Sequence, residues 1–364
     1  MPSPFSGCVL IGLLTLGCGA DEPARIGDGY PRDPATAALL RAIVPAVESA
    51  GVQVATWTAA GSPVGGLRLN AEQATIFADD PTVVAVVGHP GSRDAILGAF
   101  VYNARGVPQV VPNATSGRLG QMGPWTFTLV PSDSVEGAFI AQYALDSLGV
   151  NRVSVLYLGD EYGIGLRDGV RGALLRRGTD VVDAAVIPAD GCFQPHGLAV
   201  HEAIIKAALR RSRADAVVVT TGSGNGWCIA NLIHAEARGT WILFGDGMDG
   251  AKRVPVGMRH VVRERVRGVE FWTPGSDSAS QAFVARIQRV LNRPPDASSA
   301  LQFDAYMLLA TAIREAGADR QSIRRWLESL GGSRPAWNGL TGPIAFNRPR
   351  TEILRMSGPM GEPP

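Results

Sequence analysis

Hydrophobic residues along this chain fall into two kinds of segment that alternate. Short runs that are apolar at successive positions, such as 82–88 ("TVVAVVG") and 215–222 ("DAVVVTTG"), predict strands with both faces buried. Longer stretches with apolar residues three and four positions apart predict amphipathic helices. One of these, 92–106, begins with serine and ends with glycine, which is typical of a helix. Repeated strand–helix units predict parallel sheets covered by helices on both faces.

The strand–helix units occur in two series. The first contains helices at 34–50, 69–80 and 92–106 and strands at 52–57, 82–88 and 107–112. The second contains helices at 135–149, 163–178, 201–213 and 227–239 and strands at 152–160, 180–187, 215–222 and 240–246. After it we predict a strand at 266–275, helices at 278–291, 298–317 and 320–330, and a closing strand at 342–347. Two such series predict two doubly wound α/β lobes, with a ligand cleft where the carboxyl ends of their strands face each other.

The N-terminus carries a separate apolar segment, 8–16, which is too short to span a bilayer and is typical of a secretory signal. The following "LTLGC" is similar to a bacterial lipobox, with Cys18 as the residue that would be acylated. Thr15 stands where leucine is usual, and no Lys or Arg precedes the apolar run. A cleaved signal without an anchor, or a start codon placed elsewhere, are the alternatives. We predict a signal peptide and lipobox over 1–23, and an exported protein, periplasmic or at the cell surface, anchored to a bacterial membrane by lipid.

Two further cysteines, Cys192 and Cys228, each follow a β-rich segment. In an exported protein we expect this pair to form a disulfide. His196 and His234 lie nearby, but their spacing matches no common zinc pattern. The sequence predicts neither a metal nor a cofactor.

The overall charge of the chain argues against some classes of binding partner. The formal net charge is +1 and no basic tail is present, which argues against nucleic acid and acidic membrane surfaces as partners. "TGSGNG" lacks the Lys-Ser/Thr of a P-loop, and "GIGLRDG" is not a dinucleotide fingerprint. "TGSGNGWC" does not match a nucleophile elbow. These patterns favour a binding protein over an enzyme.

Six motifs, in order and at suitable spacing, resemble the type I periplasmic binding proteins: "VVAVVGHPGS", "GVPQVVPNATS", "LGDEYGIGLRDG", "ILFGDGMD", "LQFDAYMLLATAIREAG" and "GLTGPIAF". The nearest group is the branched-chain amino acid and amide binders of ABC importers. The resemblance implies a hinged two-lobed (Venus-flytrap) fold in which the chain crosses between lobes three times. We expect lobe 1 to comprise 24–131 plus 250–338, and lobe 2 to comprise 132–249 plus 339–364.

Ser92 begins the helix that follows strand 82–88. It can cap that helix, and the free amides at the positive end of the helix dipole suit a carboxylate. The resemblance implies that Ser92 binds a ligand carboxylate or amide. Arg93 either strengthens this anion site or pairs with Asp94 on the surface.

A second polar corner follows strand 107–112. Its residues are Asn113, Ala114, Thr115 and Ser116, of which Thr115 and Ser116 offer hydroxyl and amide groups on the same side as Ser92. The alternative is a simple turn. Tyr30, Trp57 and Trp272 are candidates for an apolar pocket wall, although each residue type is more often found in a core.

The second lobe supplies the residues that we expect to contact the ligand when the two lobes close. The resemblance places Tyr162 against the bound ligand. Gly222 and Ser223 follow a strand and are expected to line the cleft. A ligand ammonium needs a carboxylate, for which Asp246 and Asp249 are the candidates, and the resemblance favours Asp246. The alternative role of these aspartates is to stabilise a crossover turn.

The resemblance implies a monomeric substrate-binding protein that captures an amino acid or amide by lobe closure and delivers it to an ABC transporter permease. A periplasmic sensor acting through a separate receptor is the first alternative, and a hydrolase is the second. A change in melting temperature with an amino acid would separate the binding roles from the hydrolase.

Overall fold

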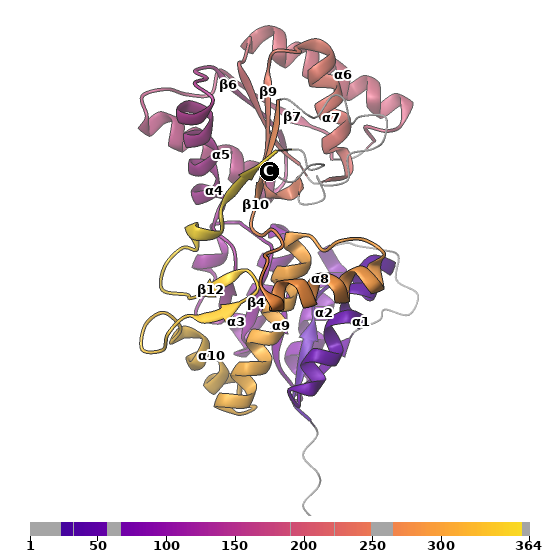
Figure 1. Cartoon of the computed structure of the whole chain (residues 1–364), viewed down its shortest axis with the longest axis vertical. Coiled ribbons are helices and arrows are strands. Elements are labelled where there is room, and N and C mark those ends of the chain that lie inside the picture. Colours follow the sequence, from indigo (N-terminus) through magenta and orange to yellow (C-terminus); the bar gives the residue numbers. More distant parts are fainter. Residues whose placement is uncertain are drawn as a thin grey trace, which may run out of the picture.

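The computed structural model of the 364-residue chain describes residues 23–31, 33–56, 67–189, 191–221, 223–248 and 265–358. The helices and strands form two lobes stacked along the long axis of the molecule, each built on its own sheet (Figure 1). Both sheets are dominated by parallel pairs, and helices cover their faces. The predicted α/β fold with two doubly wound lobes is confirmed. The predictions for Cys18, Trp57, Gly222 and Asp249 lie outside the described residues.

The first sheet has the strand order β2-β1-β3-β4-β5, and all of its pairs are parallel. Its strands are β1 (Arg25–Asp28), β2 (Gln53–Thr56), β3 (Val83–Val87), β4 (Gln109–Val111) and β5 (Thr126–Thr128). The helices of this lobe are α1 (Pro34–Ser49), α2 (Leu67–Asp79), α3 (Ser92–Arg105), α8 (Ser278–Leu291), α9 (Ala297–Ala316) and α10 (Arg320–Glu328). A small hairpin of β11 (Trp337–Gly339) and β12 (Gly342–Ile344) and a short 3₁₀ turn, Leu119–Gln121, complete it. The sequence patterns did not identify β1, which lies between β2 and β3.

The second sheet has the order β13-β10-β9-β8-β6-β7, in which only β13 is antiparallel to its neighbour among the described pairs. Its strands are β6 (Val153–Leu158), β7 (Asp183–Ile187), β8 (Ala216–Thr220), β9 (Trp241–Phe244), β10 (Val266–Glu270) and β13 (Arg355–Ser357). The helices of this lobe are α4 (Asp133–Gln142), continued by a π-helical turn over Tyr143–Ser147, then α5 (Glu161–Arg176), α6 (Pro195–Ser212) and α7 (Ser223–Glu236). A 3₁₀ turn, Thr351–Ile353, precedes β13.

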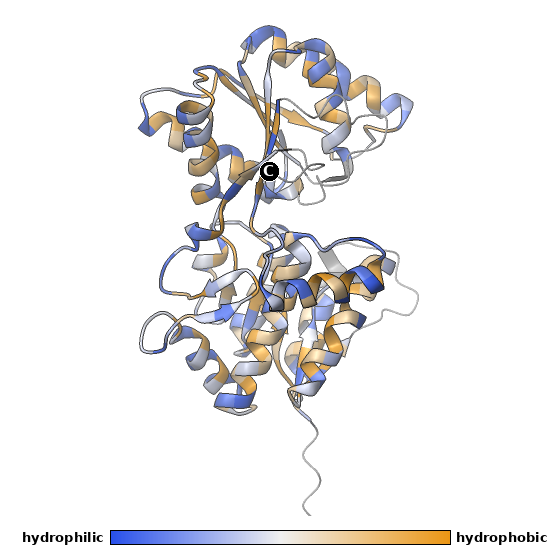
Figure 2. Cartoon of the chain, in the orientation of Figure 1, coloured by the Kyte–Doolittle hydropathy of each residue, from blue (hydrophilic) through white to orange (hydrophobic). Residues whose placement is uncertain are grey.

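The local sequence explains these elements. All residues of β3 and β8 are buried, as expected for central parallel strands. Aspartate side chains accept hydrogen bonds from first-turn amides at the starts of α1, α5, α8, α9 and α10, which satisfies donors that have no partner inside the helix. Most helices carry both hydrophobic and hydrophilic residues, as Figure 2 shows, because one face packs on a sheet.

The sheet pairing differs from the expected lobe limits at two places. The strand β10 falls within 250–338, which the sequence assigned to lobe 1, but it pairs with β9 and β13 of the second sheet. The hairpin strand β12 falls within 339–364, assigned to lobe 2, but its partner β11 contacts α9 of the first lobe. In the described part of the chain, the backbone therefore changes sheet after β5, after β10 and after β12.

Arg350 joins two of these connections. Its guanidinium is buried and donates hydrogen bonds to the carbonyl oxygens of Leu129 at 2.6 Å, Thr341 at 3.1 Å and Pro343 at 3.1 Å. Nearby, Asp304 accepts hydrogen bonds from the backbone amides of Leu340 at 2.7 Å and Thr341 at 2.8 Å. Arg350 thus ties the segment after β5 to the hairpin that precedes the last change of sheet.

The helices α4 and α5 pack at very short distance through glycine. A Cβ atom on Gly137 would lie 2.4 Å from the backbone carbon of Gly169 and from the backbone nitrogen of Val170. On the other side of the contact, a Cβ on Gly165 would lie 2.2 Å from a carboxylate oxygen of Asp133. These contacts hold the first half of α4 against α5 over the stretch from Gly165 to Val170.

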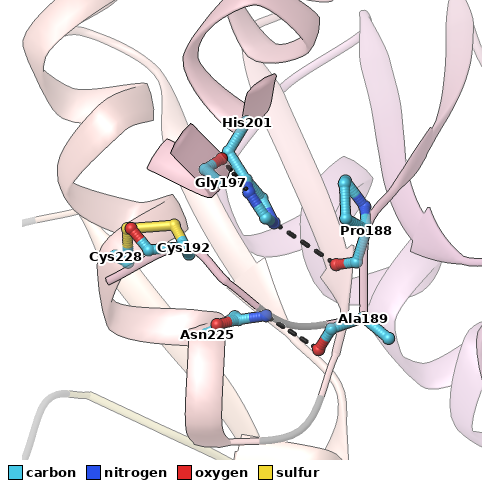
Figure 3. Close-up of a disulfide and its surroundings, with 7 residues drawn as sticks. All are labelled: Pro188, Ala189, Cys192, Gly197, His201, Asn225 and Cys228. Carbon is cyan, nitrogen blue, oxygen red and sulfur yellow. Dashed lines mark hydrogen bonds between the residues drawn. A yellow bond between two sulfur atoms is a disulfide. The ribbon is translucent and has the colours of Figure 1, made fainter. Parts of the chain in front are cut away.

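The predicted disulfide is confirmed. Cys192 and Cys228 are bonded, with their Cα atoms 6.1 Å apart, and the bond fastens the segment after β7 to α7 (Figure 3). In the same region the ring nitrogens of His201 lie 2.7 Å from the Gly197 carbonyl oxygen and 3.3 Å from the Pro188 carbonyl oxygen. His201 therefore holds this loop in place through its ring nitrogens and does not act as a metal ligand.

Reduction of the disulfide is expected to lower the free energy of unfolding by about 4 kcal/mol, because the bond closes a loop across a sequence separation of 36 residues. Urea unfolding with and without a reductant measures the loss. A Cys192→Ser, Cys228→Ser double variant should match the reduced protein and show no further response to reductant. Two free thiols in the unfolded, oxidised protein would contradict the pairing.

Candidate functional site

A cavity of about 600 Å³ lies between the two lobes. It is lined at the carboxyl ends of strands from both sheets, where α/β folds place their ligands. From the first lobe come residues that follow β3 and β4 and the start of α9. From the second lobe come residues at or after the ends of β6, β7, β8, β9 and β10. The predicted interlobe cleft is therefore present in this structure.

Ser92 lines the cavity at the first residue of α3. It does not cap the helix, because Gly91 occupies the N-cap position with φ 73°, a conformation that favours glycine. The Ser92 hydroxyl is buried, and no group in the described part of the chain bonds to it. A buried hydroxyl without a partner costs free energy, so this group is poised to bond to a molecule in the cavity.

Asn113, Ala114 and Thr115 follow β4 and line the same wall. The Asn113 amide nitrogen donates hydrogen bonds to the Tyr30 hydroxyl at 3.1 Å and to the Ser298 hydroxyl at 2.8 Å. These bonds orient the side chain, and its amide oxygen is buried without a partner among the described residues. Tyr30 is buried in the core and supports Asn113 rather than lining the cavity.

The other candidates of the first wall differ in their exposure. Arg93 is exposed and lines the cavity. Trp272, considered as a wall of the pocket, is buried against Phe283 and does not line the cavity.

Tyr162 and Asp246 line the opposite wall. The Tyr162 hydroxyl accepts a hydrogen bond from the Gly247 amide at 3.0 Å, and this bond holds the loop after β9 against α5. One carboxylate oxygen of Asp246 is buried without a partner among the described groups. Burial raises the pKa of Asp246 to about 6. Asp246 is thus a carboxylate at the cavity surface with no protein cation among the described ion pairs.

Two carboxyl groups that the sequence analysis missed lie behind this wall. Glu136 of α4 is fully buried and accepts a hydrogen bond from the Asp246 amide at 2.8 Å. Burial, followed by the charge of Asp246, raises the pKa of Glu136 well above its usual value. Asp133, also on α4, is buried, and burial raises its pKa to about 7. The second wall therefore rests on a cluster of carboxyl groups.

The remaining part of this wall comes from the loops near the disulfide. Asn225 of α7 donates a hydrogen bond to the Ala189 carbonyl oxygen at 2.8 Å, and both residues line the cavity (Figure 3). Ser223, another candidate for this wall, is the first residue of α7.

An ion pair connects the two lobes beside the cavity. Glu161 at the start of α5 accepts hydrogen bonds from the Ser116 hydroxyl at 3.0 Å and from the Arg118 guanidinium at 3.1 Å. Because the Arg118 side chain is more than half exposed, we expect little stabilisation from this pair.

The two walls have different chemistry. The first offers hydroxyl and amide groups at a helix N-terminus, which suit a carboxylate or an amide. The second offers the Asp246 carboxylate, which has no ion pair within the described part of the chain and suits a cation. Among the residues that the structure describes, no three His, Cys, Asp or Glu side chains are placed to hold a metal ion, and no helix is long and apolar enough to cross a membrane.

The match to known proteins covers most of the chain. The family model described as "Periplasmic binding protein" matches residues 67–357. The chain belongs to the periplasmic binding protein family. It is therefore a solute-binding protein rather than an enzyme, and the family implies export to the periplasm.

Relatives of this periplasmic binding protein are known in sequence and in structure. "Leu/Ile/Val-binding protein homolog 1" of Brucella abortus is 24% identical over 346 residues, which cover 90% of this chain and 88% of the relative. An ABC transporter substrate-binding protein from Desulfitobacterium hafniense, solved in complex with Leu, aligns with a TM-score of 0.72 at 22% identity, over 92% of this chain and 97% of that one. A solute-binding protein from R. palustris, solved in complex with benzoate, aligns with a TM-score of 0.75 at 16% identity, over 93% and 94%.

Proposed function

We propose that this protein captures a small amino acid or amide between its lobes and delivers it to the permease of an ABC importer. Contacts from both walls exist together only when the cleft is closed, so the ligand stabilises the closed form. The permease then recognises that form. We further propose that Cys18 is acylated and anchors a monomeric protein to the membrane.

One observation supports the choice of ligand: Asp246, a cavity-lining carboxylate with no protein cation among the described ion pairs, faces a wall that offers the Ser92 hydroxyl, amide groups and the exposed Arg93 side chain. An amino acid places its ammonium group on Asp246 and its carboxylate on the other wall. The same arrangement disfavours a simple aromatic acid, such as the benzoate bound by the R. palustris protein, because that ligand brings only negative charge toward buried carboxyl groups.

The sheet pairing also refines the proposed lobes. We propose that lobe 1 comprises 24–131 plus the segment from α8 to the end of β12. We propose that lobe 2 comprises 132–249, β10 and the C-terminal segment from the 3₁₀ turn onward. Three short connections then form the hinge.

Asp246→Asn is expected to weaken amino-acid binding by about 100-fold, because the ligand ammonium loses a charge-assisted hydrogen bond in a buried site. Calorimetry with a panel of amino acids, amides and benzoate, on protein without its first 18 residues, measures the change. Binding of the best ligand at a hundred times its dissociation constant should add about 2.7 kcal/mol to stability.

Asp160→Asn is the matched control. Asp160 lines the same cavity, but its carboxylate already accepts a hydrogen bond from the Gly163 amide at 2.8 Å, and asparagine caps a helix equally well. We expect the affinity of the Asp160→Asn protein for the amino acid to stay within a few-fold of the affinity of the parent protein. Equal affinity in the Asp246→Asn protein and its parent would remove Asp246 from the ligand site.

A further inference from the structure

Glu136 and Asp246 form a carboxyl pair at the cavity wall. The Asp246 amide donates to one oxygen of Glu136 at 2.8 Å, while the other Glu136 oxygen is buried without a partner. One carboxylate oxygen of Asp246 is likewise buried without a hydrogen-bond partner among the described residues. Neither residue takes part in an ion pair within the described ranges. Glu136 does not itself line the cavity, so it acts on a ligand only through Asp246.

Among the described residues, the groups around this pair add no positive charge. On α4 the pair faces Asp133, and on α5 it faces Tyr162, with Asp160 and Glu161 at the start of that helix contributing further negative charge to the cluster. Glycine at position 245 lets the loop after β9 approach Glu136 and Tyr162 closely. A Cβ on Gly245 would lie 3.0 Å from a Glu136 oxygen and 2.5 Å from the Tyr162 hydroxyl.

Two adjacent buried carboxyl groups cannot both be ionised at low cost, because each charge disfavours the other and burial disfavours both. Such a pair holds one proton between its members, and the proton belongs to the pair rather than to either residue. The directions of the pKa shifts agree, since both are raised and each group responds to the other. In the empty cavity the pair therefore carries about one negative charge.

We propose that the Glu136–Asp246 pair gives up its shared proton when a ligand ammonium binds, so that the site exchanges one cation for another. This inference rests on the proposed function. The carboxylic O–H bond of the pair breaks, the proton leaves to solvent, and the ammonium takes its place between the walls. The total charge of the buried site stays constant, which is the reason for the exchange. Glu136 is a positioning residue that couples ligand capture to proton release and favours a cationic group over a neutral amide.

Glu136→Gln tests the exchange. Glutamine keeps an oxygen to accept the Asp246 amide hydrogen, but it has no proton to release. Calorimetric titration of an amino acid in two buffers with different ionisation enthalpies, between pH 6 and pH 8, counts the protons released. The parent protein should release roughly half to one proton per ligand, and its affinity should rise with pH by up to about tenfold per unit. The Glu136→Gln protein should release clearly fewer protons per ligand than the parent protein, and its affinity should rise less steeply with pH, because burial still raises the pKa of Asp246.

Glu48→Gln, an exposed change of the same type on α1, is the matched control and should behave as the parent protein. Binding without proton release by the parent protein would overturn the exchange and leave the proposed function intact. Equal proton release by the parent and Glu136→Gln proteins would overturn the role of Glu136. A parent protein that binds no amino acid would overturn the proposed function and the exchange together.

A ligand-free measurement tests the shared proton separately. A carboxyl group with a raised folded-state pKa stabilises the protein less as pH rises from its unfolded pKa through its folded pKa. From pH 5 to pH 8 the melting temperature of the Glu136→Gln protein should therefore rise relative to the parent protein, by at least about 3 °C. Parallel curves for the two proteins would show that the pair holds no proton in the empty cavity and would overturn the proposal.

Discussion

An Arg350→Met protein is expected to lose about 4 kcal/mol of its free energy of unfolding, because the substitution leaves a set of buried carbonyl groups without their donor. The guanidinium donates to Leu129 at the end of the first lobe's sheet, and to Thr341 and Pro343 in the hairpin. Burial lowers the pKa of Arg350 to about 10, so the side chain is still charged at pH 7. Methionine fills much of the volume but donates nothing.

Urea unfolding at pH 7 measures the effect of Arg350→Met. Arg348→Met is the control, since Arg348 lies two residues away, is mostly exposed and pairs with Glu352 at 3.4 Å on the surface. We expect the control to change stability by less than about 1 kcal/mol. Similar losses in the two proteins would show that the buried hydrogen bonds of Arg350 are not the cause.

The second large effect is expected at the crossing of α4 and α5. Gly137→Leu should lower the free energy of unfolding by about 4 kcal/mol, at the upper end of overpacking costs, because its Cβ would lie 2.4 Å from the backbone of Gly169 and Val170. Backbone atoms in a helix cannot rotate away, so the two helices must separate. Since α4 carries Glu136 and Asp133, we also expect the site to be disturbed.

Gly172→Leu on α5 is the matched control for the crossing. A Cβ there would meet only the end of the Arg176 side chain, at 3.6 Å. Leucine is the better helix former by about 1 kcal/mol, so this protein should be as stable as its parent or slightly more stable. Chemical unfolding of both variants makes the comparison, and a tolerated leucine at position 137 would contradict the close contact of the helices.

Much of this fold could be predicted from the sequence because the buried strands consist almost entirely of apolar residues. Strands such as β3 and β8 are apolar at almost every position, and the two cysteines follow β-rich segments. The four-residue strand β1 was missed because Arg25 and Asp28 flank only two uncharged positions. The sequence assigned β10 to the first lobe with the helices that follow it, whereas the strand pairs with β9 and β13, because pairing between distant strands leaves no local signal.

The candidate site could be predicted only where a side chain follows a strand. Ser92, Asn113, Tyr162 and Asp246 line the cavity, as that rule requires. Glu136 could not be found in this way. A glutamate within a helix is normally interpreted as part of a solvated face, and its burial depends on the close packing of α4 on α5 and on the loop after β9. Tyr30 was expected near the ligand, but it supports Asn113 from the core.

The division of the cavity between two sheets has an evolutionary consequence. The half that suits an anion and the half that suits a cation are encoded in separate stretches of the chain, so substitutions in one need not disturb the folding of the other. A related protein with a neutral residue at both Glu136 and Asp246 would bind acidic or uncharged ligands while its opposite wall stayed the same. Diversification of transport substrates would then proceed one half-site at a time.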